Sequence, residues 1–254
     1  MQRLVLCILV WFSSVVMAAE PPLVAVASNM TQAMTEIAGR FQSSSGIKIK
    51  LSFGSSGNFA RQILQGARYQ LFVAADKKYV DMLRDNGRQL TRIAEFAQGR
   101  IDFFIPKDSR LAGPGDLHSI VNAIEFGNYR RLVIANPEVA PYGLAAKQAL
   151  ASAGIWIINY SKLLVGENAA QAVQFSLSGA VDIGIIPASA AVQPEVRERG
   201  SFIPIPEAWH LPIQHYLVLL GSANPSAVRF YDYLLTGAAQ RILVTYGYTP
   251  NMRD

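Results

Sequence analysis

Strand-like apolar runs, short turns rich in Ser, Asn, Gly and Pro, and helical stretches follow one another four times along the chain. In the helical stretches the apolar residues recur every three or four positions, which is the period of a helix with one buried face. The preceding runs are continuously apolar, as in strands that are covered on both faces. The predicted strands of the four repeats cover residues 23–27, 47–53, 132–135 and 163–165. Of the helices that follow them, the first includes Phe41, the second includes Leu64, and the third and fourth cover residues 144–153 and 169–177.

Outside the repeats, strands and helices continue to alternate without a low-complexity segment or a long linker. Such alternation predicts an α/β fold with parallel sheets flanked by helices. Two repeats lie in residues 23–66 and two in residues 132–178, which predicts two similar lobes. Ligands of open α/β sheets bind beyond the carboxyl ends of the strands, so two facing lobes would enclose a ligand in a cleft. The further predicted strands cover 70–75, 99–106, 180–186 and 217–220, and the further helices 78–86, 188–192, 226–235 and 238–246.

The four strand-to-helix turns carry the candidate chemistry. A helix N-terminus presents unpaired backbone N–H groups and the positive end of the helix dipole, and it therefore attracts anions. Each turn also has a plainer interpretation: Ser28 and Asn29 could be ordinary N-caps. Gly54 and Gly57 could serve turn geometry alone, and Tyr142 could be a packing residue. Because four equivalent turns occur, two in each predicted lobe, we expect them to converge on one small oxyanion.

The first residues have the pattern of an export signal. Arg3 gives a short basic segment, residues 4–16 an apolar one, and Met17-Ala18-Ala19 a small-residue cleavage site, so residues 1–19 are predicted to be removed. The mature protein is therefore expected in the periplasm. Cys7 is the only cysteine and lies in this segment, so the mature chain would form no disulfide. No later stretch approaches the roughly 20 uncharged apolar residues of a membrane span, and no membrane insertion is expected.

Charge is mild and scattered. The chain has 23 Lys and Arg against 18 Asp and Glu, and removing Arg3 leaves an excess of about four positive charges. The adjacent basic pairs, Lys77-Lys78 and Arg130-Arg131, do not form a basic stripe interleaved with aromatic residues, so nucleic-acid binding is not expected. A weak positive field could still attract an anion.

Four segments of the chain form a specific pattern when they are taken in order and spacing: FGSSGNFARQI, LFVAADKKYVDML, ANPEVAPYGLAAKQAL and GENAAQAVQFSLSGAVDIGIIP. Together they resemble one known family, the periplasmic molybdate-binding proteins of ABC importers. The resemblance implies a two-lobed type II periplasmic-binding fold, with residues 20–98 and 212–254 in one lobe and 99–211 in the other. Two strands would form the hinge, near residues 96–99 and 210–216. The implied protein is a monomer that delivers molybdate or tungstate to a membrane permease.

The resemblance also implies a set of ligand residues, which hold the anion through hydroxyl groups and backbone N–H groups. One position departs from the family pattern, because some members have a ligand-binding tyrosine where this chain has Pro187. Proline offers neither a hydroxyl nor an N–H. The residues that match the family's ligand positions are Ser28, Asn29, Ser56, Tyr142 and Ala169.

The chemistry of such donors suits a fully deprotonated dianion. Molybdate, tungstate and sulfate only accept hydrogen bonds near neutral pH, so neutral donors serve all of their oxygens, and neither a cofactor nor a metal ligand set is expected. Phosphate keeps a proton and favours a site with an acceptor. Glu167 is a carboxylate in the fourth turn, and its plainer interpretation is an acidic residue that the helix dipole favours near a helix start. Sulfate or another tetrahedral oxyanion stays an alternative ligand, since cavity size separates it from molybdate.

Enzymatic activity is not expected. The glycine-serine turn at residues 54–57 lacks the Gly-x-Ser-x-Gly spacing of hydrolases, and the chain has neither a Gly-Lys-Ser/Thr phosphate loop nor a dinucleotide fingerprint. A secreted serine hydrolase with Ser56 as nucleophile and His215 as base stays open. A sensor or scaffold with the same fold and no permease is a further alternative. Tyr246 and Tyr248 are interpreted as core residues without a function.

Overall fold

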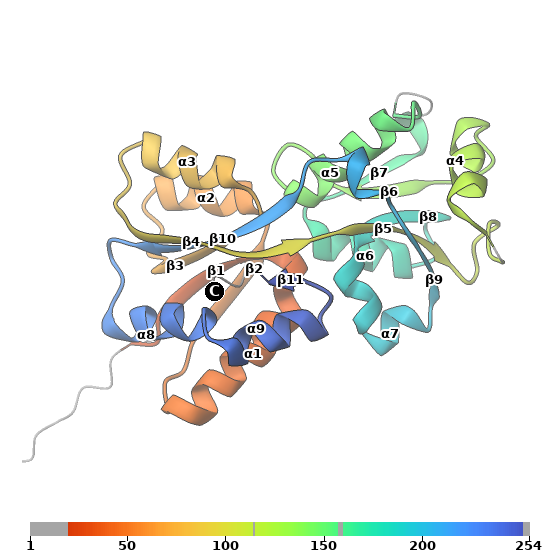
Figure 1. The fold of residues 1–254 in the computed structure, drawn as a ribbon. Helices are drawn as coiled ribbons and strands as arrows, with labels where there is room; N and C mark the ends of the chain where they lie inside the picture. The colour runs from red at the N-terminus through yellow and green to blue at the C-terminus, as the bar shows by residue number, and fades with distance from the viewer. Residues whose placement is uncertain (1–19, 114, 157–159, 251–254) are drawn as a thin grey trace, which may run out of the picture.

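The computed structural model describes residues 20–113, 115–156 and 160–250, so the predicted signal segment lies outside the described residues. The described strands form two sheets side by side, each covered by helices on both faces (Figure 1). We call the six-stranded sheet and its helices the first lobe, and the five-stranded sheet and its helices the second lobe. The strand orders are β11-β4-β10-β3-β1-β2 and β7-β6-β8-β5-β9.

The first lobe has one layer of helices on each face of its sheet (Figure 1). Its strand β3 (Leu71–Ala74) shows why: Leu71 and Val73 pack with α1, α8 and α9, while Phe72 and Ala74 pack with α2 and α3. Alternate side chains of a strand point to opposite faces, so a run without a polar residue needs a cover on both sides. The other strands are β1 (Leu23–Ala27), β2 (Lys50–Gly54), β4 (Leu90–Gly99), β10 (Ile213–Leu220) and β11 (Thr249–Pro250), and the helices are η1 (Ser28–Met30), α1 (Thr31–Ser45), α2 (Ser56–Leu64), α3 (Lys77–Asp85), α8 (Pro225–Leu234) and α9 (Gly237–Thr245).

The second lobe repeats this arrangement, with α4 and α5 on one face of its sheet and α6 and α7 on the other (Figure 1). Ile134 of β6 faces the first pair of helices and Val133 the second. Its strands are β5 (Ile101–Pro106), β6 (Leu132–Ala135), β7 (Leu163–Gly166), β8 (Ile183–Pro187) and β9 (Gly200–Pro204), and its helices are α4 (Leu117–Glu125), α5 (Pro141–Ser152), η2 (Tyr160–Lys162), α6 (Ala169–Leu177), η3 (Ala188–Val192), α7 (Pro194–Arg197) and η4 (Glu207–Trp209).

The prediction of parallel sheets is only partly right, because both sheets are mixed. The repeat strands pair in parallel, β1 with β2 and β6 with β7, as expected of strands joined by helices. β10 runs antiparallel to β3 and β4, and β5 runs antiparallel to β8 and β9. These antiparallel strands adjoin the passages between the lobes, where no crossover helix intervenes.

The chain passes between the lobes at two places. From β4 to β5 only Arg100 intervenes, and the chain returns from β9 through η4 to β10. The lobe boundaries and hinge ranges that we drew from the sequence stay proposals, and these two passages are the segments that would bend. None of the helices in the described part of the chain is long and apolar enough to cross a membrane.

The topology places the four repeat turns at the carboxyl ends of two adjacent strand pairs. β1 and β2 lead into η1 with α1 and into α2, and β6 and β7 lead into α5 and α6. The start of α5 packs against the end of β6 so closely that a Cβ atom on Gly143 would lie 2.2 Å from the Ala135 carbonyl oxygen. Only glycine permits this approach, so Gly143 lets the start of α5 pack directly against the end of β6.

Candidate functional site

The start of α2 in the first lobe is hydrogen-bonded to both repeat turns of the second lobe. The Gly57 N–H donates to the Val139 carbonyl oxygen, which precedes α5, at 2.9 Å. The Asn58 side-chain amide donates to Glu167 Oε1, which precedes α6, at 3.1 Å. A Cβ on Gly57 would lie 2.9 Å from the Val139 oxygen, and its φ is not positive. Turn geometry is therefore the wrong explanation for this glycine, because close approach of the lobes requires it.

The segment η1 makes the matching contacts from the same lobe. The Ala170 N–H of α6 donates to Ser28 Oγ at 3.3 Å. The Asn29 side-chain nitrogen donates to the Tyr142 hydroxyl of α5 at 3.1 Å. Each repeat turn of the first lobe thus contacts both repeat turns of the second. The four predicted turns do come together, although the two turns of the first lobe lie far from those of the second lobe in the chain.

The predicted ligand residues occupy the first turns of these helices. Ser56 and Ala169 are the first residues of α2 and α6, and Tyr142 is the second residue of α5. Their N–H groups precede the first intrahelical hydrogen bond and can serve an external acceptor. Ser56 is fully buried, and its Oγ accepts the Ala75 N–H at 3.0 Å. The hydroxyl hydrogen of Ser56 therefore remains available to donate.

Asn29 has a different environment from the other four. Its Nδ2 lies 3.1 Å from the Tyr142 hydroxyl, 2.8 Å from His215 Nε2 and 3.0 Å from the Tyr248 hydroxyl. The Tyr248 hydroxyl donates in turn to the Asn29 carbonyl oxygen at 2.7 Å. The amide nitrogen of Asn29 is thus engaged by three side chains of the protein, so this residue organises a polar network beside the four helix starts.

Hydrogen bonding fixes the tautomer of His215. Its Nδ1 lies 3.2 Å from the Ala97 carbonyl oxygen, which can only accept, so Nδ1 carries the hydrogen. Nε2 is then an acceptor and takes one hydrogen of the Asn29 amide. This arrangement requires the neutral imidazole.

The network is uncharged near neutral pH. Burial raises the pKa of Tyr142 well above its usual range and raises the pKa of Tyr248 to about 12. Burial also lowers the pKa of His215 to about 4. All three groups are therefore neutral at pH 7. The helix dipoles and N–H groups remain as the electrostatic features that favour an anion.

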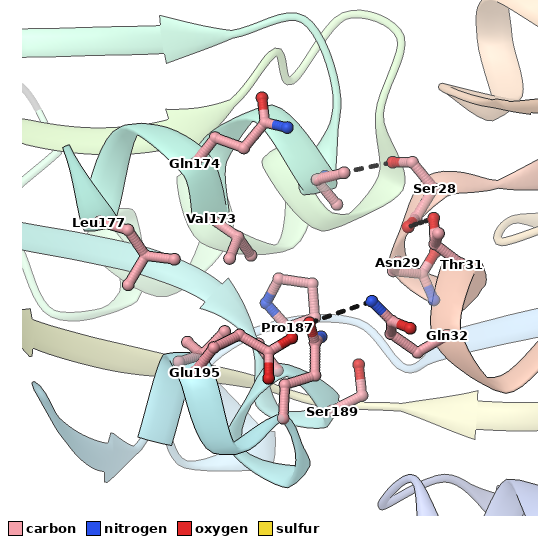
Figure 2. A pocket seen from close by; sticks show the side chains of 15 residues that line it. Ser28, Asn29, Thr31, Gln32, Val173, Gln174, Leu177, Pro187, Ser189 and Glu195 are labelled. Atoms are coloured by element: carbon pink, nitrogen blue, oxygen red, sulfur yellow. Dashed lines mark hydrogen bonds between the residues drawn. The ribbon is translucent and has the colours of Figure 1, made fainter. Parts of the chain in front are cut away.

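A cavity of about 240 Å³ opens beside these turns, and Figure 2 shows its lining. Ser28, Asn29 and Ala169 border it, whereas its lining, drawn from the described residues, includes neither Ser56 nor Tyr142. Across its outer part, Gln32 Nε2 donates to Gln193 Oε1 at 3.3 Å and joins the lobes again. The apolar wall consists of Val173, Leu177, Pro187, Ala190 and Val196.

Three further residues bear on the alternatives. Pro187 ends β8 at this cavity, so the departure from the family pattern lies beside the proposed site. Ser56 is hydrogen-bonded to Ala75, whereas His215 is hydrogen-bonded to Asn29 and Ala97. The two residues do not contact each other as a nucleophile and its base would, so these bonds give the hydrolase interpretation no support. In the parts of the chain that the structure describes, no group of three His, Cys, Asp or Glu side chains could hold a metal ion.

Tyr248 is the residue that sequence reasoning missed. The sequence indicates a core residue without a function, and Tyr248 is indeed buried, but its hydroxyl contacts Asn29 and also lies 3.1 Å from Ser189 Oγ. It follows Gly247, which has a φ of 76° and ends the last helix. That glycine was the only local signal, and a glycine after a helix indicates the turn and not its contacts.

Comparisons with known proteins agree with this arrangement. The model of the family "Bacterial extracellular solute-binding protein" matches residues 22–249. The molybdate-binding protein ModA of Azotobacter vinelandii is 34% identical over 228 residues, which cover 89% of this chain and 88% of that protein. A solved periplasmic molybdate-binding protein of the same organism superimposes with a TM-score of 0.81 at 26% identity, covering 90% of this chain and 98% of that one. The sulfate-binding protein SubI of Mycobacterium tuberculosis shares the fold at 14% identity, with a TM-score of 0.74 over 91% of this chain and 86% of its own.

Proposed function

The chain belongs to the family of bacterial extracellular solute-binding proteins, and we propose that it captures molybdate or tungstate and delivers it to the membrane permease of an ABC importer. The observation that carries this proposal is the crosswise contact of four helix N-termini, two from each lobe. Such a group of N–H donors suits an anion that has no hydrogen to donate.

The proposed site consists of neutral donors. The N–H groups of Ser56, Tyr142 and Ala169 and the hydroxyls of Ser28 and Ser56 hold the oxygens. Asn29 is the fifth ligand residue of the proposal, and its side chain also orients the site through its network. A dianion needs no countercharge here, because hydrogen bonds to a charged acceptor are strong where water is excluded. The relative named as molybdate-binding supports this choice of ligand.

Capture follows from closure of the lobes. In an open form the first lobe offers the starts of η1 and α2 to an incoming anion. Closure brings the starts of α5 and α6 onto it, expels water and strengthens each hydrogen bond. The two passages between the sheets act as the hinge. The protein works as a monomer in the periplasm, is exported by residues 1–19, and performs no catalysis.

Sulfate is the second candidate ligand. It is also a tetrahedral dianion without hydrogens, and a sulfate-binding protein shares this fold. The shared fold does not separate the two, because selection between them depends on cavity size. The molybdate-binding relative is more similar in sequence and favours molybdate.

Titration calorimetry of the mature, ligand-stripped protein with molybdate, tungstate, sulfate and phosphate tests the proposal. We expect tight binding of molybdate and tungstate and at least about 100-fold weaker binding of sulfate, which is about 2.7 kcal/mol. Tight sulfate binding would keep the mechanism and change the ligand. Failure to bind any of the four anions would contradict the proposed function.

A further inference from the structure

The side chain of Tyr142 reaches from the second lobe into a slot of the first lobe. The slot lies at Gly99, the last residue of β4, where a Cβ atom would be 1.9 Å from the Tyr142 hydroxyl oxygen. No real Cβ atom is that close to another atom. The φ of Gly99 is not positive, so the backbone conformation does not require glycine there. The reason for glycine at this position is the space that it leaves for the hydroxyl of Tyr142.

The walls of this slot are polar and uncharged. Asn29 Nδ2 donates to the Tyr142 hydroxyl at 3.1 Å, and the His215 ring lies with its centroid 6.1 Å from that of Tyr142. His215 is fully buried and is held by the Ala97 carbonyl of β4. The slot is therefore built by β4, β10 and η1 of the first lobe, and β4 and β10 are the strands next to the passages between the lobes.

Tyr248 makes a second link between the lobes at the same place. The residue after it, Thr249, pairs with β4, which fixes Tyr248 in the first lobe. Its hydroxyl bonds to Asn29 and lies 3.1 Å from Ser189 Oγ of η3, which belongs to the second lobe. Both tyrosine hydroxyls thus make their contacts across the lobes only when the lobes are together.

We propose that Tyr142 and Tyr248 form a latch that sets the population of the closed state, and that Tyr142 couples closure to ligand capture. The side chain of Tyr142 enters the Gly99 slot, while its backbone N–H belongs to the first turn of α5, which we assign to the proposed anion site. The second half of this inference rests on the proposed function, whereas the latch itself does not. Both tyrosines are positioning residues, because their hydroxyls act on the lobes.

A latch changes affinity without changing selectivity. The apparent dissociation constant of a ligand that needs the closed state rises as the population of that state falls. Tyr142→Phe keeps the backbone N–H and the ring but loses the hydroxyl. We expect molybdate and tungstate each to bind about 5- to 10-fold more weakly, the effect of one hydrogen bond, with their ratio unchanged. A changed ratio or an unchanged affinity would contradict the latch.

A double-mutant cycle tests the slot directly. Gly99→Ala places a methyl group where the Tyr142 hydroxyl lies, and it should weaken molybdate binding by more than about 10-fold. In the Tyr142→Phe background that hydroxyl is absent, so Gly99→Ala should cost at least about fivefold less. Gly39→Ala is the matched control, because a Cβ there meets nothing within 4 Å. Equal costs of Gly99→Ala in the two backgrounds would overturn the proposal.

A crosslinking assay reads closure without any ligand. Gln32 and Gln193 touch across the cavity, and the mature chain has no cysteine, so Gln32→Cys with Gln193→Cys adds the only two thiols. A short bismaleimide should join them several-fold more slowly when Tyr142→Phe or Tyr248→Phe is added. If the parent protein bound no oxyanion, the proposed function would fail while this rate still tested the latch. Equal rates in all three proteins would refute it.

Discussion

Replacing Ser56 by alanine, with Ser55→Ala as its neighbour control, gives the sharpest test of the site. The two serines are adjacent at the start of α2, and both are almost fully buried. Ser56 Oγ accepts the Ala75 N–H, whereas Ser55 Oγ has no hydrogen-bond partner among the described residues. The two changes remove the same atom from neighbouring buried positions and differ in what that atom contacts.

The magnitude follows from these contacts. Ala75 is 1% exposed, so without Ser56 Oγ its N–H would be buried and unpaired. That costs about 1 to 3 kcal/mol of unfolding free energy. Ser55 is the N-cap residue of α2 but makes no side-chain cap hydrogen bond, so Ser55→Ala should change stability by less than about 0.5 kcal/mol. The proposed anion also loses a donor in Ser56→Ala, which weakens binding by about 1.5 to 3 kcal/mol, or roughly 10- to 150-fold.

Two assays separate these effects. Urea unfolding of the ligand-free proteins, followed by circular dichroism, gives the stability change. Calorimetry with molybdate at a temperature where both variants are folded gives the change in binding. The reasoning fails if Ser55→Ala is as destabilising as Ser56→Ala. The assignment of Ser56 to the site fails if Ser56→Ala binds molybdate as tightly as the parent protein.

Three further predictions follow from the described contacts. The pKa of His215 is lowered to about 4 in the folded protein, so unfolding takes up a proton as pH falls from 6.5 to 4, and the stability that is present above pH 6.5 is lost in that window. Urea unfolding at pH 7 and at pH 4 should show that the unfolding free energy of the parent protein falls by about 3 kcal/mol more than that of His215→Gln. Gly57→Ala, which pushes the lobes apart at a backbone carbonyl, should weaken molybdate binding at least about 10-fold in calorimetry, whereas Gly39→Ala should leave it unchanged. Asp182 is fully buried and accepts three hydrogen bonds from the half-exposed Arg130. Asp182→Asn should therefore lower the unfolding free energy, measured by urea unfolding, by about 2 to 3 kcal/mol. A change below about 0.5 kcal/mol would show that this ion pair does not stabilise the fold.

The elements that could be predicted are those whose local pattern is sufficient. β1, β6 and α6 have the bounds that the sequence indicates, because an uninterrupted apolar run or a helical period with a clear start determines each of them. The helix start at Ser56 lies inside the glycine-serine turn that the sequence indicates at residues 54–57, since the buried Ser56 and Gly57 already belong to α2.

The strand β4 could not be predicted from its own residues. Residues 91–93 are exposed, while Phe96, Ala97 and Gly99 are buried, so the segment has neither a period of two nor a continuous apolar run. It is a strand because β10 and β11 pair with it on its two sides. The same holds for the polar network, in which Tyr248 and Asn29 lie 219 residues apart in the chain. Tertiary pairing, which the local pattern does not contain, decides both.

The environment of Glu167 connects the closed arrangement to the choice of anion. A carboxylate beside the site could accept the hydrogen that phosphate keeps near neutral pH, and it would then favour phosphate over molybdate. In this structure Glu167 Oε1 accepts from the Asn58 amide, and Asn58 in turn accepts from Arg61. The carboxylate is thus held at the junction of the lobes by a donor from α2 and has a structural partner. The tyrosines and His215 of the buried network are neutral and are hydrogen-bonded to Asn29, so the donors that the proposed site offers to an anion come from the helix starts. An oxyanion without hydrogens needs donors alone, whereas phosphate also needs an acceptor for the hydrogen that it keeps. We therefore expect the proposed site, which offers N–H and hydroxyl donors, to bind phosphate more weakly than molybdate.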